Sequence, residues 1–207
     1  MSDVRVLIVE DEPMIAEDIA AGLERNDFIV SAICYHKEDA LAELNNNLPD
    51  IALLDINLNG EMDGFVLAEE IQSKHFIPFV FITSYSDKTT LEKAKHCEPY
   101  GYIVKPFNAA SLYTTVEIAL YNFNQRNKRS FPELNLQKLN THLTDPITDR
   151  EFDLLKLIYE GKTNKQIADD MFISTNTVKK HINNAYLKID TTSRATTIAK
   201  LRDLMLQ

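Results

Sequence analysis

The chain has 207 residues, 44% hydrophobic and 26% charged, a composition typical of a globular protein with one large or two small domains. No apolar stretch approaches the roughly 18 residues that a membrane-spanning helix needs, and the N-terminus lacks the basic start and cleavage site of a signal peptide. The two cysteines, Cys34 and Cys97, suggest no disulfide framework or metal spacing, so we expect reduced thiols in a cytosolic protein with no membrane partner.

The net charge of −9 is divided unevenly along the chain. Residues 1–124 hold 21 Asp and Glu against 8 Lys and Arg, a net charge of −13, whereas residues 125–207 hold 10 against 14, a net charge of +4. Opposite signs in the two parts indicate two domains with different partners, and the basic part is the candidate for binding a polyanion.

The first part alternates short apolar runs with amphipathic segments. The runs are rich in Val, Ile and Phe and alternate little, which predicts strands buried on both faces, over residues 5–9, 28–34, 51–56, 79–83 and 101–105. Helical periodicity between them predicts helices over Met14–Arg25, Lys37–Leu44, Phe65–Lys74, Thr89–Lys95 and Ala109–Asn124. Five strand–helix units predict an α/β fold, with a doubly wound parallel sheet covered on both sides.

The periodic pattern is lost between Gln125 and Thr144, where Pro132 stands among scattered polar residues and a basic cluster. We interpret this segment as a linker, with a helical start continuing from Asn124. After it, amphipathic patterns predict four helices, over Asp149–Glu160, Asn164–Met171, Thr175–Ile189 and Ser193–Leu206. The expected organisation is therefore a domain over 1–124, a linker over 125–144 and a small all-α domain over 145–207.

Charged and hydroxyl side chains follow the predicted strands at the points where they end. The first run is followed by Glu10, Asp11 and Glu12, the third ends in Asp55, the fourth in Thr83 and the fifth in Lys105. The carboxyl ends of parallel strands meet at one edge of the sheet, where ligands bind, so these groups should converge. Clustered carboxylates raise one another's pKa unless a cation lies among them, and carboxylate and carbonyl oxygens suit Mg²⁺.

This arrangement predicts phosphoryl chemistry on a single acid. Asp55 would be the nucleophile that forms an aspartyl phosphate, and Lys105 is a compact cation suited to a phosphoryl oxygen. Together with Mg²⁺, Lys105 would offset the charge on the transferring group.

The segments "LIVEDE", "LLDIN", "FITS" and "GYIVKPF" resemble, in this order and spacing, the CheY-like receiver domain of two-component response regulators. The resemblance implies a flavodoxin-like sheet of order 2-1-3-4-5 and a cis bond at Lys105–Pro106. It also implies roles for individual residues. Asp55 would be the phosphoacceptor and Lys105 would bind the phosphate, while Thr83 and Tyr102 would be the switch residues. The metal pocket would be formed by Glu10, Asp11, Asp55 and the Asn57 carbonyl. The loop "NLNGEMDG" departs from the common pattern, being one residue longer and lacking a proline.

The basic part contains two helical patterns joined by "FIS". In the second, an apolar stripe over Val178, Ile182, Ala185 and Ile189 lies opposite basic and amide side chains, and Ser174 is a plausible N-cap. Two short helices of this kind describe a helix-turn-helix with its recognition helix.

The segments "ITDRE", "EGKTNKQIA", "ISTNTVKKHINN" and "SR" resemble the LuxR/NarL-type DNA-binding domain. The resemblance implies that Lys179, Lys180 and Asn183 face base edges of double-stranded DNA. It implies phosphate contacts by Lys165, Thr175, Thr177, Lys188 and Arg194. Two copies on adjacent half-sites are expected. The last helix, with Ile198, Leu201 and Leu204, either forms the dimer contact or packs inside the monomer.

These features predict a transcription regulator that a sensor histidine kinase switches by phosphorylating Asp55 with Mg²⁺, and that forms a homodimer when phosphorylated. Apart from transferring phosphate to itself and losing it slowly, the protein is not expected to be an enzyme. One alternative is a haloacid-dehalogenase-type phosphatase, although Asn57 stands where those enzymes carry a second acid. Another is a degenerate receiver that takes no phosphate and serves only for dimerisation.

Overall fold

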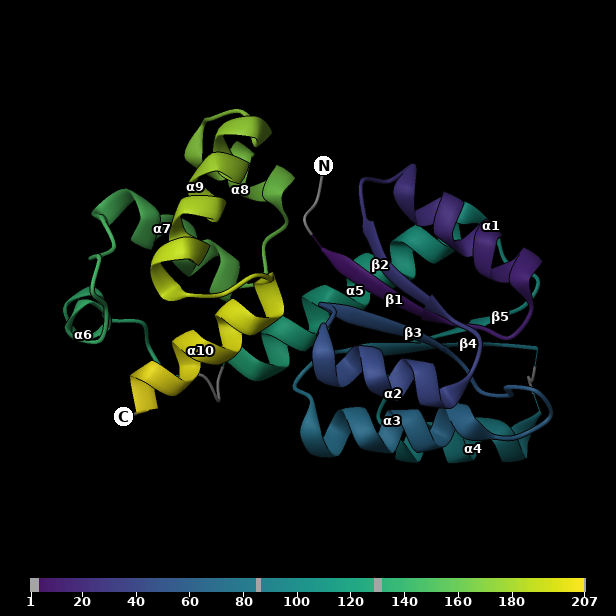
Figure 1. Cartoon of the computed structure of the whole chain (residues 1–207). Helices are drawn as coiled ribbons and strands as arrows, with labels where there is room; N and C mark the ends of the chain where they lie inside the picture. The colour runs from purple at the N-terminus through teal and green to yellow at the C-terminus, as the bar shows by residue number, and fades with distance from the viewer. Residues whose placement is uncertain (1–3, 85–86, 129–131, 207) are drawn as a thin grey trace. The chain divides into compact units, whose positions relative to one another are not determined.

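The computed structural model describes residues 4–84, 87–128 and 132–206. Its contacts divide the chain into two compact units, Val4–Phe123 and the part from Asn124 onward, and each is described by itself. Figure 1 labels the elements of both.

The first unit is built on a five-stranded parallel sheet. Its strands are β1 (Arg5–Val9), β2 (Ile29–Cys34), β3 (Ile51–Asp55), β4 (Phe79–Thr83) and β5 (Gly101–Val104), in the order β2-β1-β3-β4-β5. The order crosses between β1 and β3, and this switch point is where parallel sheets of this kind bind ligands. The predicted parallel sheet and its order are confirmed.

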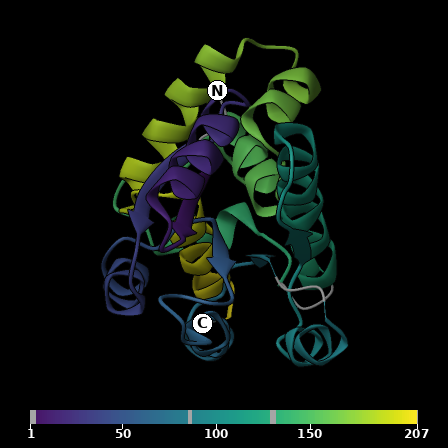
Figure 2. The same cartoon turned by 90° about the vertical axis from the view of Figure 1, so that its right-hand side faces the viewer.

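Helices cover both faces of this sheet (Figure 2). They are α1 (Pro13–Glu24), α2 (Lys37–Asn46), α3 (Asp63–Lys74), α4 (Lys88–His96) and α5 (Ala109–Lys128), which begins in this unit. Val80 and Ile82 of β4 pack in a core cluster with α1 and α5, whereas the Phe81 ring lies 5.5 Å from that of Phe65 on α3. The central strands are buried on both sides, which explains why their sequences alternate so little.

Gly64 holds the first turn of α3 against the end of β3. A Cβ atom at this position would lie 2.1 Å from the Asp55 carbonyl oxygen, so no side chain fits there. The Gly64 N–H donates to the Ile56 carbonyl at 3.1 Å. Glycine at this position therefore allows the helix to start directly beside Asp55.

The second unit contains the remaining helices, α6 (Leu136–Thr141), α7 (Asp149–Tyr159), α8 (Asn164–Met171), α9 (Thr175–Ile189) and α10 (Arg194–Leu206). Their apolar faces meet in one core, whose fully buried members include Leu155, Ile167, Val178 and Leu201. Leu201 therefore packs inside the unit, which is one of the two alternatives predicted for the last helix. Among the described residues, no helix is both long enough and apolar enough to cross a membrane.

The segment expected to be a linker is partly folded. Helix α5 continues past Asn124 to Lys128, which agrees with the expected helical start of this segment, and α6 lies within the range 125–144. Leu134 and Leu139 belong to the core of the second unit, and the Asn140 side chain exchanges two hydrogen bonds with the Ile147 backbone at 2.7 and 3.0 Å. A six-residue helix gives too few turns for a periodic signal. Residues 129–131 of the expected linker lie outside the described residues.

Candidate functional site

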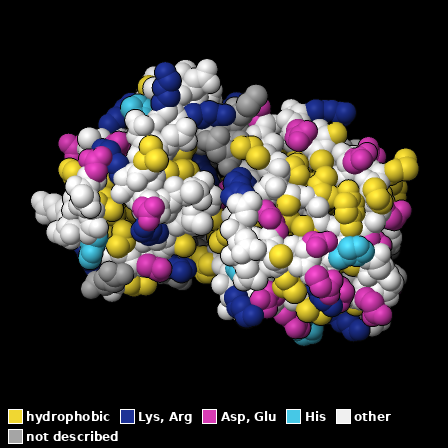
Figure 3. Space-filling model, in the orientation of Figure 1, with side chains coloured by type: hydrophobic (Ala, Val, Ile, Leu, Met, Phe, Trp, Pro, Cys, Tyr) yellow, Lys and Arg dark blue, Asp and Glu magenta, His cyan; other side chains and the backbone are white. Residues whose placement is uncertain are grey.

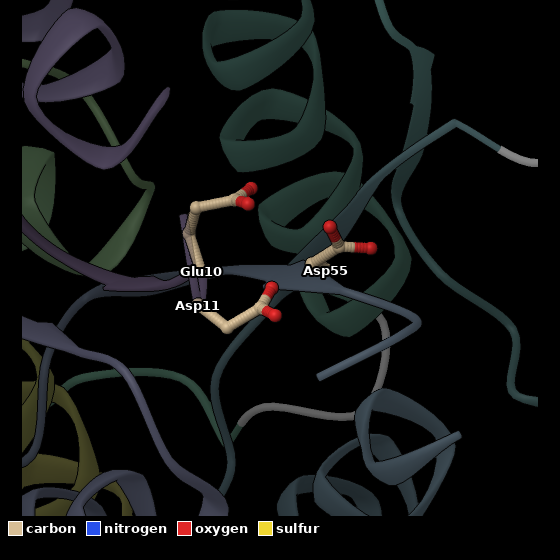
Figure 4. Close-up of side chains that lie close together, drawn as sticks. All are labelled: Glu10, Asp11 and Asp55. Carbon is tan, nitrogen blue, oxygen red and sulfur yellow. The ribbon is translucent and has the colours of Figure 1, made fainter. Parts of the chain in front are cut away.

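Three carboxylates converge at the edge of the sheet where β1 and β3 end (Figure 4). Glu10 and Asp11 follow β1, Asp55 ends β3, and one oxygen from each lies within 4.8 Å of the others. Glu10 is 1% exposed and Asp55 6%, while Asp11 is partly exposed. The structure thus brings together the acids that the sequence predicted, at the switch point of the sheet.

Lys105 lies against two of these acids. Its Nζ atom is 2.5 Å from Asp55 Oδ2 and 2.6 Å from Glu10 Oε2, and its side chain is 9% exposed. The Lys105 backbone N–H donates to the Thr83 carbonyl at 2.8 Å, which fixes the lysine beside the end of β4. The predicted cis bond between Lys105 and Pro106 is confirmed.

One ammonium does not fully compensate the acids. Burial raises the pKa of Glu10 and of Asp55, and the contacts with Lys105 offset that effect only in part. Burial alone would lower the pKa of Lys105, but its bonds to Asp55 and Glu10 raise it, so the lysine stays charged. The site therefore favours additional positive charge.

The oxygen chemistry of the site fits a hard divalent cation. The three acids offer carboxylate oxygens within 4.8 Å of one another, and nitrogen or sulfur ligands are absent from this group. Such a donor set suits Mg²⁺. Asn57, whose carbonyl was the fourth predicted ligand, follows two residues after Asp55, and its N–H donates to Asp55 Oδ1 at 3.1 Å.

The two predicted switch residues lie on adjacent strands. Thr83 ends β4 and is fully buried, while Tyr102 on β5 is partly exposed. The Tyr102 ring packs edge-on to Phe81 with 6.4 Å between ring centroids.

Figure 3 shows many acidic side chains over the visible face of the first unit, in keeping with its negative charge.

Asn59 is a contact residue of the site that the sequence analysis missed. Its backbone N–H donates to Asp11 Oδ2 at 3.0 Å, and it lies in the loop that departs from the usual receiver pattern. The Asn-Gly pair in "NLNGEMDG" was the available signal, because this dipeptide favours a tight two-residue turn.

The helix-turn-helix of the second unit is formed by α8 and α9. Thr163 and Gln166 form a capping box at the start of α8, and Ser174 caps α9 by accepting from the Thr177 N–H at 3.1 Å. Phe172 ends α8 in a left-handed conformation with φ of 54°, which turns the chain into α9.

The predicted base-reading residues lie on the outer side of α9. Its apolar stripe is buried, whereas Lys180 and Asn183 are exposed and Lys179 is partly exposed. The residues predicted to contact DNA phosphates differ from one another in their exposure to solvent. Lys165 is exposed at the start of α8, and Thr175 and Thr177 are partly exposed in the first turn of α9.

Two of the residues predicted to contact phosphate instead bond within the unit. Arg194 is 6% exposed, and its Nη2 donates to the Lys162 carbonyl at 2.6 Å. Lys188 Nζ lies 2.9 Å from Glu151 Oε2 and 3.0 Å from the Pro146 carbonyl. Both cations pair with acceptors of neighbouring helices and loops, and sequence spacing does not reveal these contacts.

The fold and the sites define a class of protein. A parallel sheet of order 2-1-3-4-5 with acids and a lysine at its strand ends, followed by a helix-turn-helix unit, is the architecture of a DNA-binding response regulator. The chain belongs to the response regulator family: the family described as "Response regulator receiver domain" matches residues 6–117, and "Bacterial regulatory proteins, luxR family" matches residues 145–201.

Similar proteins support the same assignment. Transcriptional regulatory protein YdfI of Bacillus subtilis (strain 168) is 26% identical over 212 residues, covering 97% of each chain. Transcriptional regulatory protein LiaR of the same strain is 28% identical over 198 residues, covering 92% of this chain and 93% of LiaR. The signal receiver domain of a modulated diguanylate cyclase from Desulfovibrio desulfuricans G20 superposes with a TM-score of 0.55 at 34% identity, covering 59% of this chain and 97% of that one.

The family assignment identifies the chain as a DNA-binding regulator of a two-component system. The family is not one of turnover enzymes, and the dehalogenase-type phosphatase is therefore no longer an alternative.

Proposed function

We propose that Asp55 accepts a phosphoryl group from a sensor histidine kinase, with Mg²⁺ bound by Glu10, Asp11, Asp55 and the Asn57 carbonyl. Residues 1–124 form the phosphoacceptor domain and residues 145–207 the domain that binds double-stranded DNA. The intervening 125–144 connects them and adds α6 to the second unit. The observation that carries the proposal is the buried Asp55 carboxylate, held beside two acids and the Lys105 ammonium.

The proposed step is a single displacement at phosphorus. An oxygen of Asp55 forms the new P–O bond while the bond from phosphorus to the donor's leaving group breaks and the leaving group takes the electron pair. Lys105 shifts its ion pair from the Asp55 carboxylate to a phosphoryl oxygen, and the Thr83 hydroxyl donates to another. Bound Mg²⁺ supplies further neutralisation of the phosphoryl charge. The protein thus catalyses its own phosphorylation, and water slowly reverses it.

Intact mass measured after incubation with acetyl phosphate and Mg²⁺ tests the acceptor. We expect a gain of one phosphoryl group that is lost in Asp55→Asn and retained in Asp18→Asn, which changes an exposed acid on α1. An Asp55→Asn protein that still gains phosphate would overturn the assignment. A wild-type protein that gains none would instead favour the degenerate receiver.

Phosphorylation must act on DNA binding by shifting a population of conformations. We propose that Thr83 moves toward the phosphoryl group and Tyr102 turns inward, which reshapes the face formed by α4, β5 and α5 and promotes a homodimer. A shift from 1:99 to 99:1 requires a difference of about 5.5 kcal/mol in binding free energy. Sedimentation with and without beryllofluoride tests this: a mass increase that is absent in Thr83→Ala is expected, and an unchanged mass contradicts it.

Recognition of DNA by α9 is tested with two adjacent amides. Asn183→Ala is expected to change the preferred sequence and to cost about 1–3 kcal/mol at one base position, because an amide that pairs with a base edge is lost. Asn184→Ala is the matched control, since Asn184 is also exposed but lies about 100° further around the helix. Sequence selection from a random library measures both. Identical preferences for Asn183→Ala and the wild type would show that another face reads the bases.

A further inference from the structure

The loop that follows β3 contains a miniature hairpin. Leu58 and Glu61 exchange two backbone hydrogen bonds, of 2.8 and 3.0 Å, and form an isolated antiparallel bridge. Between them, Asn59 and Gly60 both have positive φ, 54° and 88°. These angles are those of a type I′ turn, for which Asn-Gly is the preferred pair. The extra residue of this loop is thus accommodated by a tight and well-defined turn.

The backbone of this loop is directed at the acid cluster. The Asn57 N–H donates to Asp55 Oδ1 at 3.1 Å, and the Asn59 N–H donates to Asp11 Oδ2 at 3.0 Å. The Asn57 side chain in turn accepts from the Gly60 N–H at 2.9 Å, which braces the turn from inside. The loop therefore holds one carboxylate oxygen of Asp55 and one of Asp11. The conformation of the hairpin determines where the Asn59 N–H, the donor to Asp11, lies.

The Asn59 side chain fastens the hairpin to a different part of the fold. Its Nδ2 atom donates to the Tyr35 carbonyl at 3.2 Å and lies 3.1 Å from His36 Nδ1, both in the turn between β2 and α2. Because an amide nitrogen only donates, this contact requires His36 Nδ1 to accept. An ion pair of 2.7 Å between Lys37 and Asp63 joins the starts of α2 and α3, the helices that follow the turn and the hairpin.

We infer that Asn59 is a positioning residue for Asp11: its side chain anchors the hairpin to the β2–α2 turn, so that its backbone N–H holds Asp11 in the orientation that binds the cation. The inference rests on the proposed Mg²⁺ site. Asp11 needs such a restraint because it is the partly exposed acid of the cluster, whereas Glu10 and Asp55 are buried against Lys105. Groups that orient a metal ligand commonly change metal affinity by 10-fold or more when they are removed.

The positive φ of Asn59 offers a clean variant. Glycine adopts this conformation without strain, so Asn59→Gly keeps the turn and the N–H to Asp11 and removes only the side-chain anchor. Titration of the full-length protein with Mg²⁺ by calorimetry, without phosphodonor, is expected to give a dissociation constant about 10-fold above wild type. Ca²⁺ affinity should fall less, because Ca²⁺ accepts a more flexible ligand geometry.

Two further variants complete the test. His36→Ala removes one acceptor of the anchor and should weaken Mg²⁺ binding in the same direction by a smaller factor, with no additional loss when combined with Asn59→Gly. Asn47→Ala, which removes a surface amide bonded to Glu43, should leave the Mg²⁺ affinity unchanged. The thermal midpoint without Mg²⁺ should be the same in Asn59→Gly and wild type, which separates positioning from a general loss of stability.

The outcomes distinguish this inference from the proposed function. Wild-type Mg²⁺ affinity in both Asn59→Gly and His36→Ala, with phosphorylation of Asp55 intact, overturns the positioning role and leaves the proposed function standing. Should the wild-type protein bind no Mg²⁺, the proposed metal site itself is wrong. If Asn59→Gly fails to fold, His36→Ala still decides, because its altered side chain lies outside the hairpin.

Discussion

In each unit a lysine lies against a buried glutamate, and the two pairs differ in what surrounds them. In the first unit, Lys105 lies between Glu10 and Asp55, with Asp11 close by. In the second, Lys188 faces Glu151, and the same Glu151 oxygen accepts from both the N–H and the hydroxyl of Thr148 at 2.8 Å.

The pKa shifts of the acids run in opposite directions. Burial raises the pKa of Glu10 and Asp55 beyond what Lys105 offsets. Burial also raises the pKa of Glu151, but the bonds from Thr148 and Lys188 outweigh it, so the pKa of Glu151 is lowered. The acids around Lys105 carry more negative charge than one lysine neutralises, so that site is suited to bind a further cation. The Glu151 carboxylate is stabilised by Lys188 and Thr148, so that pair holds helices of the second unit together. A lysine that pairs with buried acids thus indicates function or structure according to whether other hydrogen bonds also satisfy those acids.

The largest expected effect is on the satisfied pair. Lys188→Met removes the cation and leaves Glu151 buried without it, which should destabilise the second unit by about 3 kcal/mol. Hydrogen exchange of α7 and α9 amides in the full chain measures this unit separately from the first. Lys180→Met is the matched control on the same helix, since Lys180 is exposed. Equal protection in the two variants would contradict a structural role for Lys188.

The unsatisfied pair should respond differently, because a soluble cation can replace its lysine. Lys105→Met should lower the stability of the first unit by about 2 kcal/mol without Mg²⁺. The loss is limited because protonation of the buried acids removes part of the negative charge that Lys105 no longer neutralises. Mg²⁺ at 100 times its dissociation constant should restore about 2.7 kcal/mol. Hydrogen exchange of β3 and β4 amides with and without Mg²⁺ measures both values. Mg²⁺ should leave the lowered stability of Lys188→Met unchanged. If Mg²⁺ does not raise the stability of Lys105→Met, a soluble cation does not replace Lys105, and the proposed difference between the two pairs is wrong.

The sequence predicted that the acids and Lys105 of the first unit lie together, because the signals for this arrangement are local. Each strand is a short apolar run, and the residue at its end can be read directly, which places Glu10, Asp55, Thr83 and Lys105 at one edge once the sheet is parallel. The buried side of α9 followed equally well from helical spacing, since Val178 and Ile182 lie one turn apart and are both buried.

The contacts that the sequence did not predict join residues far apart in the chain. Asn59 bonds to Asp11, 48 residues earlier, and Lys188 bonds to Glu151, 37 residues earlier. The resemblance implied a phosphate contact for Lys188, and helical periodicity reports only the direction of a side chain along one helix, not the acid that a neighbouring helix supplies. Helix α6 was missed for a different reason, since six residues are too few for a periodic pattern.

The dependence of stability on pH should follow the sign of each shift. Because the pKa of Glu151 is lowered in the folded unit, its contribution is present above the ordinary value of 4.5 and is lost as the pH falls through the folded-state pKa. Protection of α7 and α9 amides should therefore decrease between pH 5 and pH 3, as assigned by hydrogen exchange corrected for intrinsic rates. In Glu151→Gln this decrease should be smaller, whereas Asp153→Asn, at an exposed position of α7, should retain it.

The smallest expected effect separates an exposed cation of the second unit from a buried one. Lys165 is exposed at the start of α8, so a DNA phosphate can pair with it and release a counterion. Lys165→Ala should therefore weaken binding to all sequences and reduce the slope of log affinity against log salt by about 0.9 for each protomer.

Arg194→Ala removes the same charge from a residue that is 6% exposed and bonded to the Lys162 carbonyl. It should leave the slope unchanged and lower the protection of α8 and α10 amides. DNA titrations at several salt concentrations, at a temperature where both variants are folded, measure the slopes. A reduced slope in Arg194→Ala with unchanged protection would mean that Arg194 leaves the core to contact DNA, and the distinction between structural and DNA-binding cations would then fail at this residue.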